Sequence, residues 1–358
     1  MTGRRVARFY FVAAALSAVF VMPVTARAGL IFNLTSTGNS NADSGFQQAA
    51  DFWSSQFNDD VEINLNVGFA NLGGGILGQA GSAQGTVSYT AFKNAVAADV
   101  SSVDDASYSG GLPGGSSFSM YINETDEATG ASFENPYVDN DGGANNTNVQ
   151  MTRANAKALG LLAGNAAGTD ASITFNSTFS WDFTPNDGIG AGLFDFVGVA
   201  IHEIGHAMGF ISGVDRLDSL DDGVRSDDFF RATPLDLARF SGDSEAANAD
   251  IDFTADARAK YYSIDGGATP GAPGLNHWSL GVSNGDGRQA SHWKDGLGLG
   301  IMDPTARPPG QLNIVTALDI QALDIIGWDG FTPVPEPSGF VVLGLATAGI
   351  VWRRRRRN

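Results

Sequence analysis

The sequence predicts an α+β fold in which an ordered N-terminal half, residues 29–213, precedes a loop-rich C-terminal half, residues 214–331. Three observations support this prediction. Residues 61–69 alternate apolar and polar side chains, which is the period of a half-buried strand. Residues 194–211 form an apolar run long enough for a buried helix. Beyond Gly213 the chain is rich in Asp, Gly, Ser and Pro and shows little periodicity, so few regular elements are expected there.

Most of the regular secondary structure is expected in the first half. A helix over residues 43–57 begins at Asp43 or Ser44, either of which can cap it, and places Phe46 and Trp53 on one face. The other expected elements, in chain order, are a strand over 61–69, a glycine-rich loop over 73–85, a helix over 90–100, a strand over 117–123, a polar loop over 139–147, a helix over 155–163, a strand over 173–183 and a helix capped by Asp195.

In the second half we expect only a short helix near 234–240 and a helix over 316–326. Core positions are expected for three tryptophans, which are Trp181, Trp293 and Trp328. In the polar loop, Asp139 and Asp141 could help to bind Ca²⁺, but no complete twelve-residue calcium loop follows them. An ordinary turn is therefore the preferred interpretation of that loop.

The N-terminal segment, residues 1–28, is typical of a signal peptide. It carries arginines at its start, then an apolar run over 9–24, and it ends in Ala26-Arg27-Ala28, a small-x-small cleavage pattern. We therefore expect export and cleavage after Ala28. A membrane anchor is the alternative, although the run is short for a membrane span.

The C-terminal segment, residues 332–358, combines three features in a fixed order. Pro335-Glu336-Pro337 precedes an uncharged apolar stretch over 338–352, and five consecutive arginines follow. This order resembles the PEP-CTERM sorting signal of Gram-negative bacteria, which implies removal of the tail by an exosortase-type membrane protease. The mature protein is then expected outside the cell, or in its surface or matrix, after transient membrane contact through both termini. A permanent single-span anchor is the alternative.

The body between these two segments is strongly acidic. Without the terminal arginines, Lys and Arg fall from 21 to 12 against 39 acidic residues, which leaves a charge of about −27. Such a body repels nucleic acid and anionic membranes, so neither is an expected partner. The chain has no cysteine, and a core of this size does not require disulfides.

The strongest local signal is the sequence His202-Glu203-Ile204-Gly205-His206 within the apolar run. Two histidines four residues apart on a helix lie one above the other, about 6 Å apart along the axis, so both can reach one zinc ion. Glu203 points to the side of this pair, where it can accept a proton from a zinc-activated water. The chain has only four histidines, and two of them are in this motif.

A catalytic zinc usually has three protein ligands, and the third is not adjacent here. In the extended pattern H-E-x-x-H-x-x-G-x-x-H, Gly209 is present, where a glycine lets the helix end and the chain turn under the metal. Ser212, however, occupies the ligand position, and serine binds zinc poorly. Four residues are candidates for the third ligand: His292, His277, Asp215 and Glu245. We prefer His292, because it is an imidazole close before Met302 in a turn-forming sequence, and His277 is the next choice.

Around these residues the chain resembles the metzincin metalloproteases, and among them the leishmanolysin-like branch. There, a long insertion follows the glycine, and the third histidine appears in a Ser-His-Trp context before a methionine. The matching residues are His202, Glu203, His206 and Gly209, followed by Ser291, His292, Trp293 and Met302. The resemblance implies a zincin fold with a twisted mixed sheet and the active-site helix above an irregular lower half. It also implies Met302 beneath the zinc and an edge strand, here residues 173–183, that binds extended peptide.

We therefore expect a secreted zinc-dependent endopeptidase with one catalytic Zn²⁺, held by His202, His206 and His292. Glu203 would act first as general base and then as acid toward the leaving amine, and the substrate would be a peptide or protein. Two alternatives stay open. One is a non-enzymatic surface or matrix protein stabilised by zinc, and the other is a zinc amidohydrolase that acts on an envelope substrate.

Overall fold

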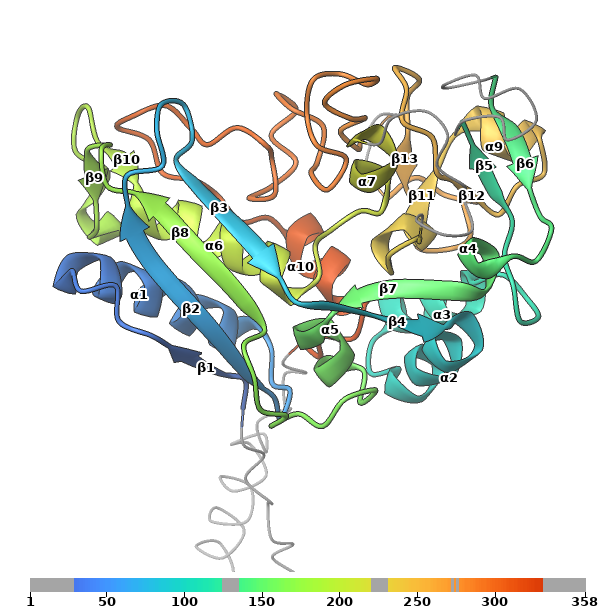
Figure 1. Ribbon diagram of the computed structural model, residues 1–358, viewed down its shortest axis with the longest axis horizontal. Coiled ribbons are helices and arrows are strands. Elements are labelled where there is room, and N and C mark those ends of the chain that lie inside the picture. Colours follow the sequence, from blue (N-terminus) through green and yellow to red (C-terminus); the bar gives the residue numbers. More distant parts are fainter. Residues whose placement is uncertain (1–28, 124–134, 220–230, 272–273, 275–276, 331–358) are drawn as a thin grey trace, which may run out of the picture.

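The computed structural model describes residues 29–123, 135–219, 231–271, 274 and 277–330, which form a mixed α/β fold with several small sheets. The largest described sheet has four strands in the order β1 (Ile31–Leu34), β2 (Glu62–Ala70), β8 (Ala171–Asn176) and β3 (Gly78–Ser82), as Figure 1 shows. Strands β1, β2 and β8 are parallel, and β3 runs antiparallel to β8. The predicted signal peptide and sorting tail lie outside the described residues.

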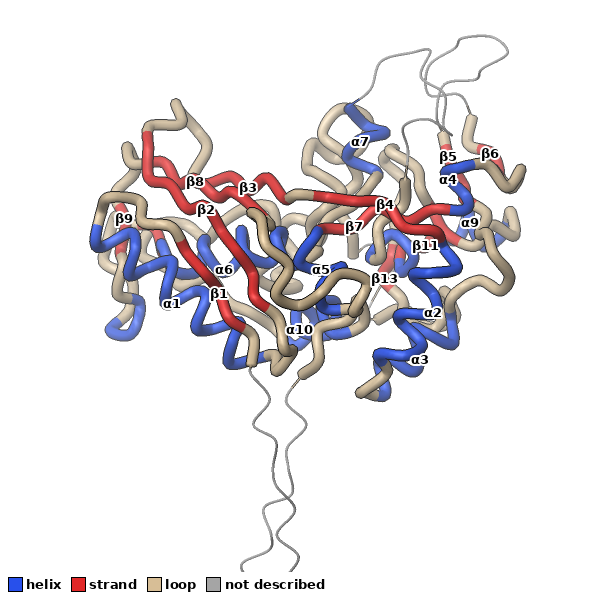
Figure 2. Tube along the Cα trace, turned by 60° about the horizontal axis from the view of Figure 1, so that its bottom comes forward, coloured by secondary structure: helices blue, strands red, loops and turns tan. Residues whose placement is uncertain are grey.

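Two helices, α1 (Ser40–Gln56) and α6 (Phe196–Met208), pack on one side of this sheet (Figure 1, Figure 2). The inward positions of β2 are apolar and buried, as the alternation predicts. The Phe46 ring lies edge-on to Phe175 and Phe196, with centroids 4.9 and 5.1 Å away. A Cβ on Gly45 would lie 2.3 Å from the Phe196 ring, so only glycine allows α1 to approach α6 this closely.

The start of α1 was predicted wrongly. The helix begins at Ser40, and the side chain of Asn39 caps it by accepting from the amides of Asn41 and Ala42. Asp43 is instead inside the first turn, where its carboxylate accepts from the amide and hydroxyl of Thr37. These bonds tie the preceding loop to the helix and lower the pKa of Asp43.

The prediction of a glycine-rich loop over 73–85 is also wrong, because this segment contains β3. Strand pairing uses backbone groups, so a glycine-rich sequence can form it when a neighbouring strand such as β8 offers free partners. As a result, β8 lies inside the sheet and the edge strand is β3, not residues 173–183. The predicted strand ends at Asn176, and only Trp181–Asp182 continue as β9, which pairs with β10 (Phe194–Asp195).

A long two-stranded ribbon leads from the sheet to the other side of the molecule (Figure 1). It is formed by β4 (Gln84–Ser88) and β7 (Asn148–Thr152), and the short helix α5 (Arg153–Ala158) follows it. Helix α2 (Tyr89–Asp99) packs against the ribbon, and α3 (Val103–Gly111) packs against α2. The predicted helix over 90–100 is therefore confirmed.

The predicted polar loop over 139–147 contains the end of β6 (Tyr137–Asp139), a turn, and the short helix α4 (Ala144–Thr147). Both carboxylates of this segment accept hydrogen bonds from groups within it. Asp139 accepts from the side-chain amide of Asn145 at 2.6 Å, and Asp141 accepts from the backbone N–H of Gly143 at 2.7 Å. This is the arrangement of a closed turn.

The described part of the second half contains short elements near both predicted helices and several more that were not predicted. They are α7 (Val214–Ser219), the 3₁₀ helix η2 (Leu235–Ala238), β11 (Arg239–Phe240), α9 (Gly242–Ala246), β12 (Ile251–Asp252), β13 (Tyr261–Tyr262) and α10 (Ala317–Asp324). The halves share structure, because β12 pairs in parallel with β5 (Met120–Ile122) of the first half. The predicted core tryptophans are all buried.

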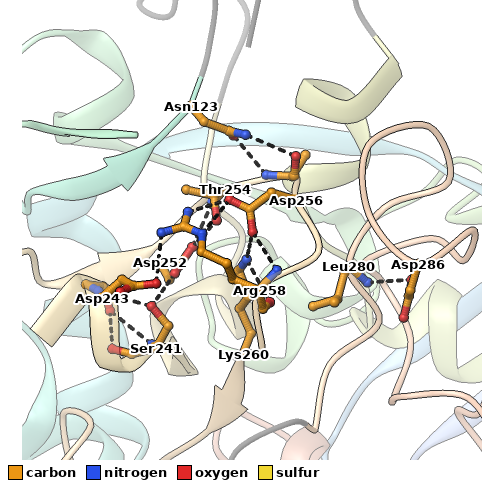
Figure 3. A network of polar contacts seen from close by, with 12 residues as sticks. Asn123, Ser241, Asp243, Asp252, Thr254, Asp256, Arg258, Lys260, Leu280 and Asp286 are labelled. Atoms are coloured by element: carbon orange, nitrogen blue, oxygen red, sulfur yellow. Dashed lines mark hydrogen bonds and ion pairs between the residues drawn. The ribbon is translucent and has the colours of Figure 1, made fainter. Parts of the chain in front are cut away.

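Polar side chains hold this irregular region together (Figure 3). Asp256 forms ion pairs with both Arg258 and Lys260, and the side chain of Lys260 is fully buried. The buried carboxylate of Asp252 accepts from Thr254, and the side chain of Asn123 exchanges two hydrogen bonds with the backbone of Ala255. These contacts supply the links that regular strands supply elsewhere. In the part of the chain that the structure describes, no helix is long and apolar enough to span a membrane.

Candidate metal centre

Helix α6 carries the His-Glu-Ile-Gly-His sequence, and both of its ends follow the prediction. At the start, the Asp195 carboxylate accepts from the Gly198 amide at 2.8 Å, which confirms Asp195 as the N-cap. At the end, Gly209 has a φ of +128°, a conformation that L side chains rarely adopt. A Cβ there would also lie 2.9 Å from Ile326, so glycine is required for the turn below the helix.

Three histidines converge at one point, two from α6 and one from the loop before Met302. The Nε2 atoms of His202 and His206 are 3.1 Å apart, and the Nε2 atom of His292 lies 3.1 Å from that of His206 and 3.3 Å from that of His202. A search of the described residues for three or more His, Cys, Asp or Glu side chains close enough to hold one metal ion finds this group alone.

The second nitrogen of each histidine ring is bonded to a backbone carbonyl. His202 Nδ1 lies 2.7 Å from the carbonyl of Ile301, and His206 Nδ1 lies 2.6 Å from that of Phe210. His292 Nδ1 faces the carbonyl of Gln289 at 3.3 Å. A carbonyl can only accept, so each Nδ1 carries the proton and each Nε2 presents a lone pair.

This donor set fits a zinc ion. Burial lowers the pKa of all three imidazoles, to about 3 for His206, which keeps them neutral as metal binding requires. Zn–N distances of about 2.0–2.1 Å in tetrahedral geometry separate neighbouring ligand nitrogens by about 3.3 Å. The observed separations of 3.1–3.3 Å match this value. Three lone pairs that face one another this closely repel unless a cation lies between them.

The turn that contains Met302 packs against α6. Met302 is fully buried, and its sulfur would be 2.7 Å from a Cβ on Gly205, the residue between Glu203 and His206 on the helix. Glycine at position 205 therefore allows the Met302 side chain to pack against α6 between Glu203 and His206. Trp53 and Trp328 hold the same helix from below, because their indole N–H groups donate to the carbonyls of Ile201 and Met208.

Asp319 of α10 fixes both segments that approach the histidines. Its Oδ1 accepts from Trp293 Nε1 at 2.9 Å and from the Met302 amide at 3.2 Å, and its Oδ2 accepts from the Ile301 amide at 2.8 Å. The same Oδ2 accepts from Thr316, so the carboxylate also caps α10. Ile301 in turn holds His202, and Trp293 follows His292, so one carboxylate positions two of the three imidazoles.

The other candidates for the third ligand have different roles. The Asp215 carboxylate accepts from the amides of Ala290 and Ser291, and so it holds the loop that presents His292. His277 is buried and accepts from the Tyr262 amide at 3.0 Å. Glu245 accepts from the hydroxyl of Tyr261, and Ser212 donates to Asp236. The structure brings none of these to the His202–His206 pair.

Glu203 lies beside the three histidines and is 8% exposed. Burial raises the pKa of its carboxyl to about 8, and within the described residues no ion pair offsets this effect. The start of β3 approaches it closely, because a Cβ on Gly78 would lie 3.4 Å from Glu203 Oε1 and 2.8 Å from the Phe175 ring. Glycine at position 78 thus leaves room between the edge strand and the carboxyl group.

Two connected hollows open on either side of Glu203 and share His202 and Gly78 in their walls. One, of about 540 Å³, has an apolar side formed by Leu77, Phe179, Phe194, Val199 and Ile314 and a polar side that includes Asp303 and Arg307. The other, of about 1070 Å³, is polar and contains the remaining ligand candidates His206 and His292. Together they form a continuous cleft along β3.

Two features of this site escaped sequence reasoning. Thr316-x-x-Asp319 matches a capping box, which signals the start of α10, but no local pattern shows that Asp319 reaches Ile301. The edge strand β3 was missed because its glycines lack the β-branched and aromatic side chains that indicate strands.

Comparison with known proteins identifies the tail. The family model described as the PEP-CTERM protein-sorting motif matches residues 333–356. This confirms the predicted sorting signal, which marks a protein that is exported to the cell envelope or surface and recognised by an exosortase processing enzyme. No curated protein and no solved structure matches the chain.

Proposed function

We propose that this chain is an exported zinc-dependent endopeptidase of the zincin type, similar to the metzincins. His202, His206 and His292 would hold one zinc ion, and Glu203 would be the general base. The observation that carries the proposal is the convergence of three unprotonated Nε2 atoms within 3.3 Å of one another, beside a carboxyl group and at the wall of an open cleft.

The remaining chemistry follows from the residues of the chain. Zinc at this site would supply Lewis acidity, which polarises a carbonyl and lowers the pKa of water to about 7. Glu203 would take a proton from the attacking water and pass it to the leaving amine. Burial raises the pKa of this carboxyl, which makes its carboxylate a stronger base toward the attacking water.

The edge strand β3 is our candidate for the substrate platform. Among the described residues it pairs with β8 on one side only, so the backbone groups on its other side are available to an extended peptide. Its first residue, Gly78, adjoins Glu203, which would bring a peptide bond on this strand within reach of the base. This arrangement supports hydrolysis of peptides over hydrolysis of a compact small molecule.

The test combines metal analysis of residues 29–331 with digestion of denatured casein, with and without a chelator. We expect about one zinc per chain, cleavage that the chelator abolishes, and recovery on addition of zinc. Bound zinc without turnover of casein would instead support a zinc-stabilised matrix protein. Turnover of an envelope amide, but not of casein, would support an amidohydrolase.

A further inference from the structure

The proposed reaction puts negative charge on the scissile carbonyl oxygen, and no side chain assigned so far donates to that oxygen. When water adds to the carbonyl, a C–O bond forms, the π electron pair moves to the carbonyl oxygen, and a water proton goes to Glu203. Donors aimed at the resulting oxyanion supply a large part of the catalysis in many hydrolases. Tyrosine is a common donor of this kind, but no described tyrosine lines either hollow of the cleft.

The junction of the two hollows contains another candidate. Six described residues line both hollows: Ile76, Gly78, His202, Glu203, Arg288 and Pro304. The scissile bond would lie at this junction, because His202 and Glu203 both belong to it. Of the other four residues, only Arg288 has a polar side chain. Its guanidinium group carries five N–H donors and stays charged across the physiological pH range.

The backbone of Arg288 has a fixed place beside the histidines. Its carbonyl accepts from the Gly281 amide at 2.9 Å, in an isolated antiparallel bridge. The chain reaches His292 four residues later, and the amides just before that histidine are held by Asp215. Burial, the neighbouring imidazoles and the charge of Arg288 all lower the pKa of His292. The guanidinium group therefore lies within electrostatic reach of the three histidines.

The side chain of Arg288 is oriented at one edge only. Its Nε donates to Asp295 Oδ2 at 2.9 Å, which fixes one edge of the guanidinium plane. No described residue accepts from the terminal nitrogens Nη1 and Nη2, so their four N–H groups are uncommitted. The side chain is also 44% exposed, so a ligand in the cleft can reach these groups.

We propose that Arg288 is a catalytic residue whose terminal N–H groups donate to the scissile carbonyl oxygen as it becomes an oxyanion. This inference rests on the proposed endopeptidase function. When the intermediate collapses, the electron pair on the oxygen reforms the carbonyl, the C–N bond breaks, and Glu203 returns its proton to the amine nitrogen. Arg288 neither gains nor loses a proton. Because the charge that it faces exists only after water has added, Arg288 should affect kcat more than substrate binding.

The kinetic test uses zinc-loaded protein, residues 29–331, and a fluorogenic peptide with blocked ends and no charged side chain. Such a peptide offers no carboxylate to Arg288, so recognition of substrate charge does not contribute. Arg288→Ala should lower kcat by about 10–100-fold and change KM by less than about three-fold, because removal of a buried oxyanion donor costs about 10²–10³-fold and Arg288 is partly exposed. Arg288→Lys, which keeps the charge but loses the planar fork, should be intermediate. Lys93→Gln removes a charge outside both hollows and should change neither constant.

Two further measurements separate catalysis from a structural role. Ethylguanidinium in the assay should restore part of the kcat of Arg288→Ala but none of that of Glu203→Gln, while zinc content and the urea midpoint of Arg288→Ala stay at the wild-type level. A phosphinic peptide carries a tetrahedral, negatively charged centre in place of the scissile amide. Arg288→Ala should weaken its binding about as much as it lowers kcat, whereas binding of the uncleaved amide peptide, measured in the Glu203→Gln background, should change little.

The outcomes separate this inference from the proposed function. A wild-type kcat in Arg288→Ala, or equal losses of affinity for the phosphinic and the amide peptide, overturns the role of Arg288 and leaves the endopeptidase function standing. Loss of zinc or of stability in Arg288→Ala, without rescue by ethylguanidinium, overturns it in favour of a structural role. If the wild-type protein cleaves no peptide and binds no phosphinic peptide, the endopeptidase function is refuted and the role of Arg288 falls with it.

Discussion

Replacement of Asp319 by alanine tests whether one buried carboxylate holds the centre together. The substitution removes the acceptor for three buried donors, Trp293 Nε1 and the amides of Ile301 and Met302. A buried donor without a partner costs about 1–3 kcal/mol. Three such donors, partly relaxed by local rearrangement of the variant, lead us to expect a loss of about 3–5 kcal/mol in the free energy of unfolding. That is a large part of the typical total stability of about 5–15 kcal/mol.

The same substitution should weaken zinc binding, because Ile301 holds His202 and Trp293 follows His292. Loss of a group that orients a ligand typically costs about 10–100-fold in metal affinity. Asp319→Asn should be intermediate, since the amide keeps one oxygen that can accept, whereas its nitrogen only donates and leaves the donors on that side without an acceptor.

The assay is urea unfolding of apo and zinc-loaded protein, together with competition for zinc by a coloured chelator. Asp324→Asn is the matched control, because Asp324 is on the same helix but accepts from Ser102, away from the histidines. It should leave zinc affinity unchanged. If Asp319→Ala unfolds at the wild-type urea midpoint and binds zinc with wild-type affinity, the carboxylate does not position the centre and the reasoning is refuted.

Three further predictions follow from the site and from one buried acid. Glu203→Gln should abolish casein cleavage while the zinc content by elemental analysis stays at the wild-type level, and measurable residual turnover would argue against this base. His292→Ala should release zinc to a weak chelator, whereas His277→Ala should not, and full retention by His292→Ala would exclude it as the third ligand. Asp59 has its pKa raised to about 8 by burial and by Asp329, so the folded state binds a proton that the unfolded state loses above about pH 4. The free energy of unfolding should therefore decrease as the pH rises from about 4 to about 8, by at most about 1.4 kcal/mol per pH unit, and Asp59→Asn should flatten this part of the urea-midpoint profile.

Much of the local structure near the site could be predicted because local chemistry determines it. Asp195, the apolar run and Gly209 define the start, course and end of α6, and the structure confirms both ends. The position of His292 beside α6 was expected from its sequence context. The structure brings its Nε2 within 3.3 Å of the other two.

Long-range pairing could not be predicted in the same way. Strand β3 forms because β8 offers it hydrogen-bond partners, and this depends on a segment about 90 residues away in the chain, not on its own glycines. The roles of Asp215 and Asp319 depend on which backbone amides come within reach after folding. An acidic residue near a histidine motif looks like a ligand in sequence, and only geometry shows that Asp215 supports the loop instead.

The offset of 86 positions between His206 and His292 also has a consequence for when the proposed zinc centre can assemble. A partly synthesised chain that ends before residue 292 has the helix and the base but lacks the third imidazole. A chain that crosses the inner membrane unfolded cannot assemble the triad until its distal half has folded on the far side. If the proposed centre is hydrolytic, the order of its residues along the chain would thus delay its assembly until the distal half has folded.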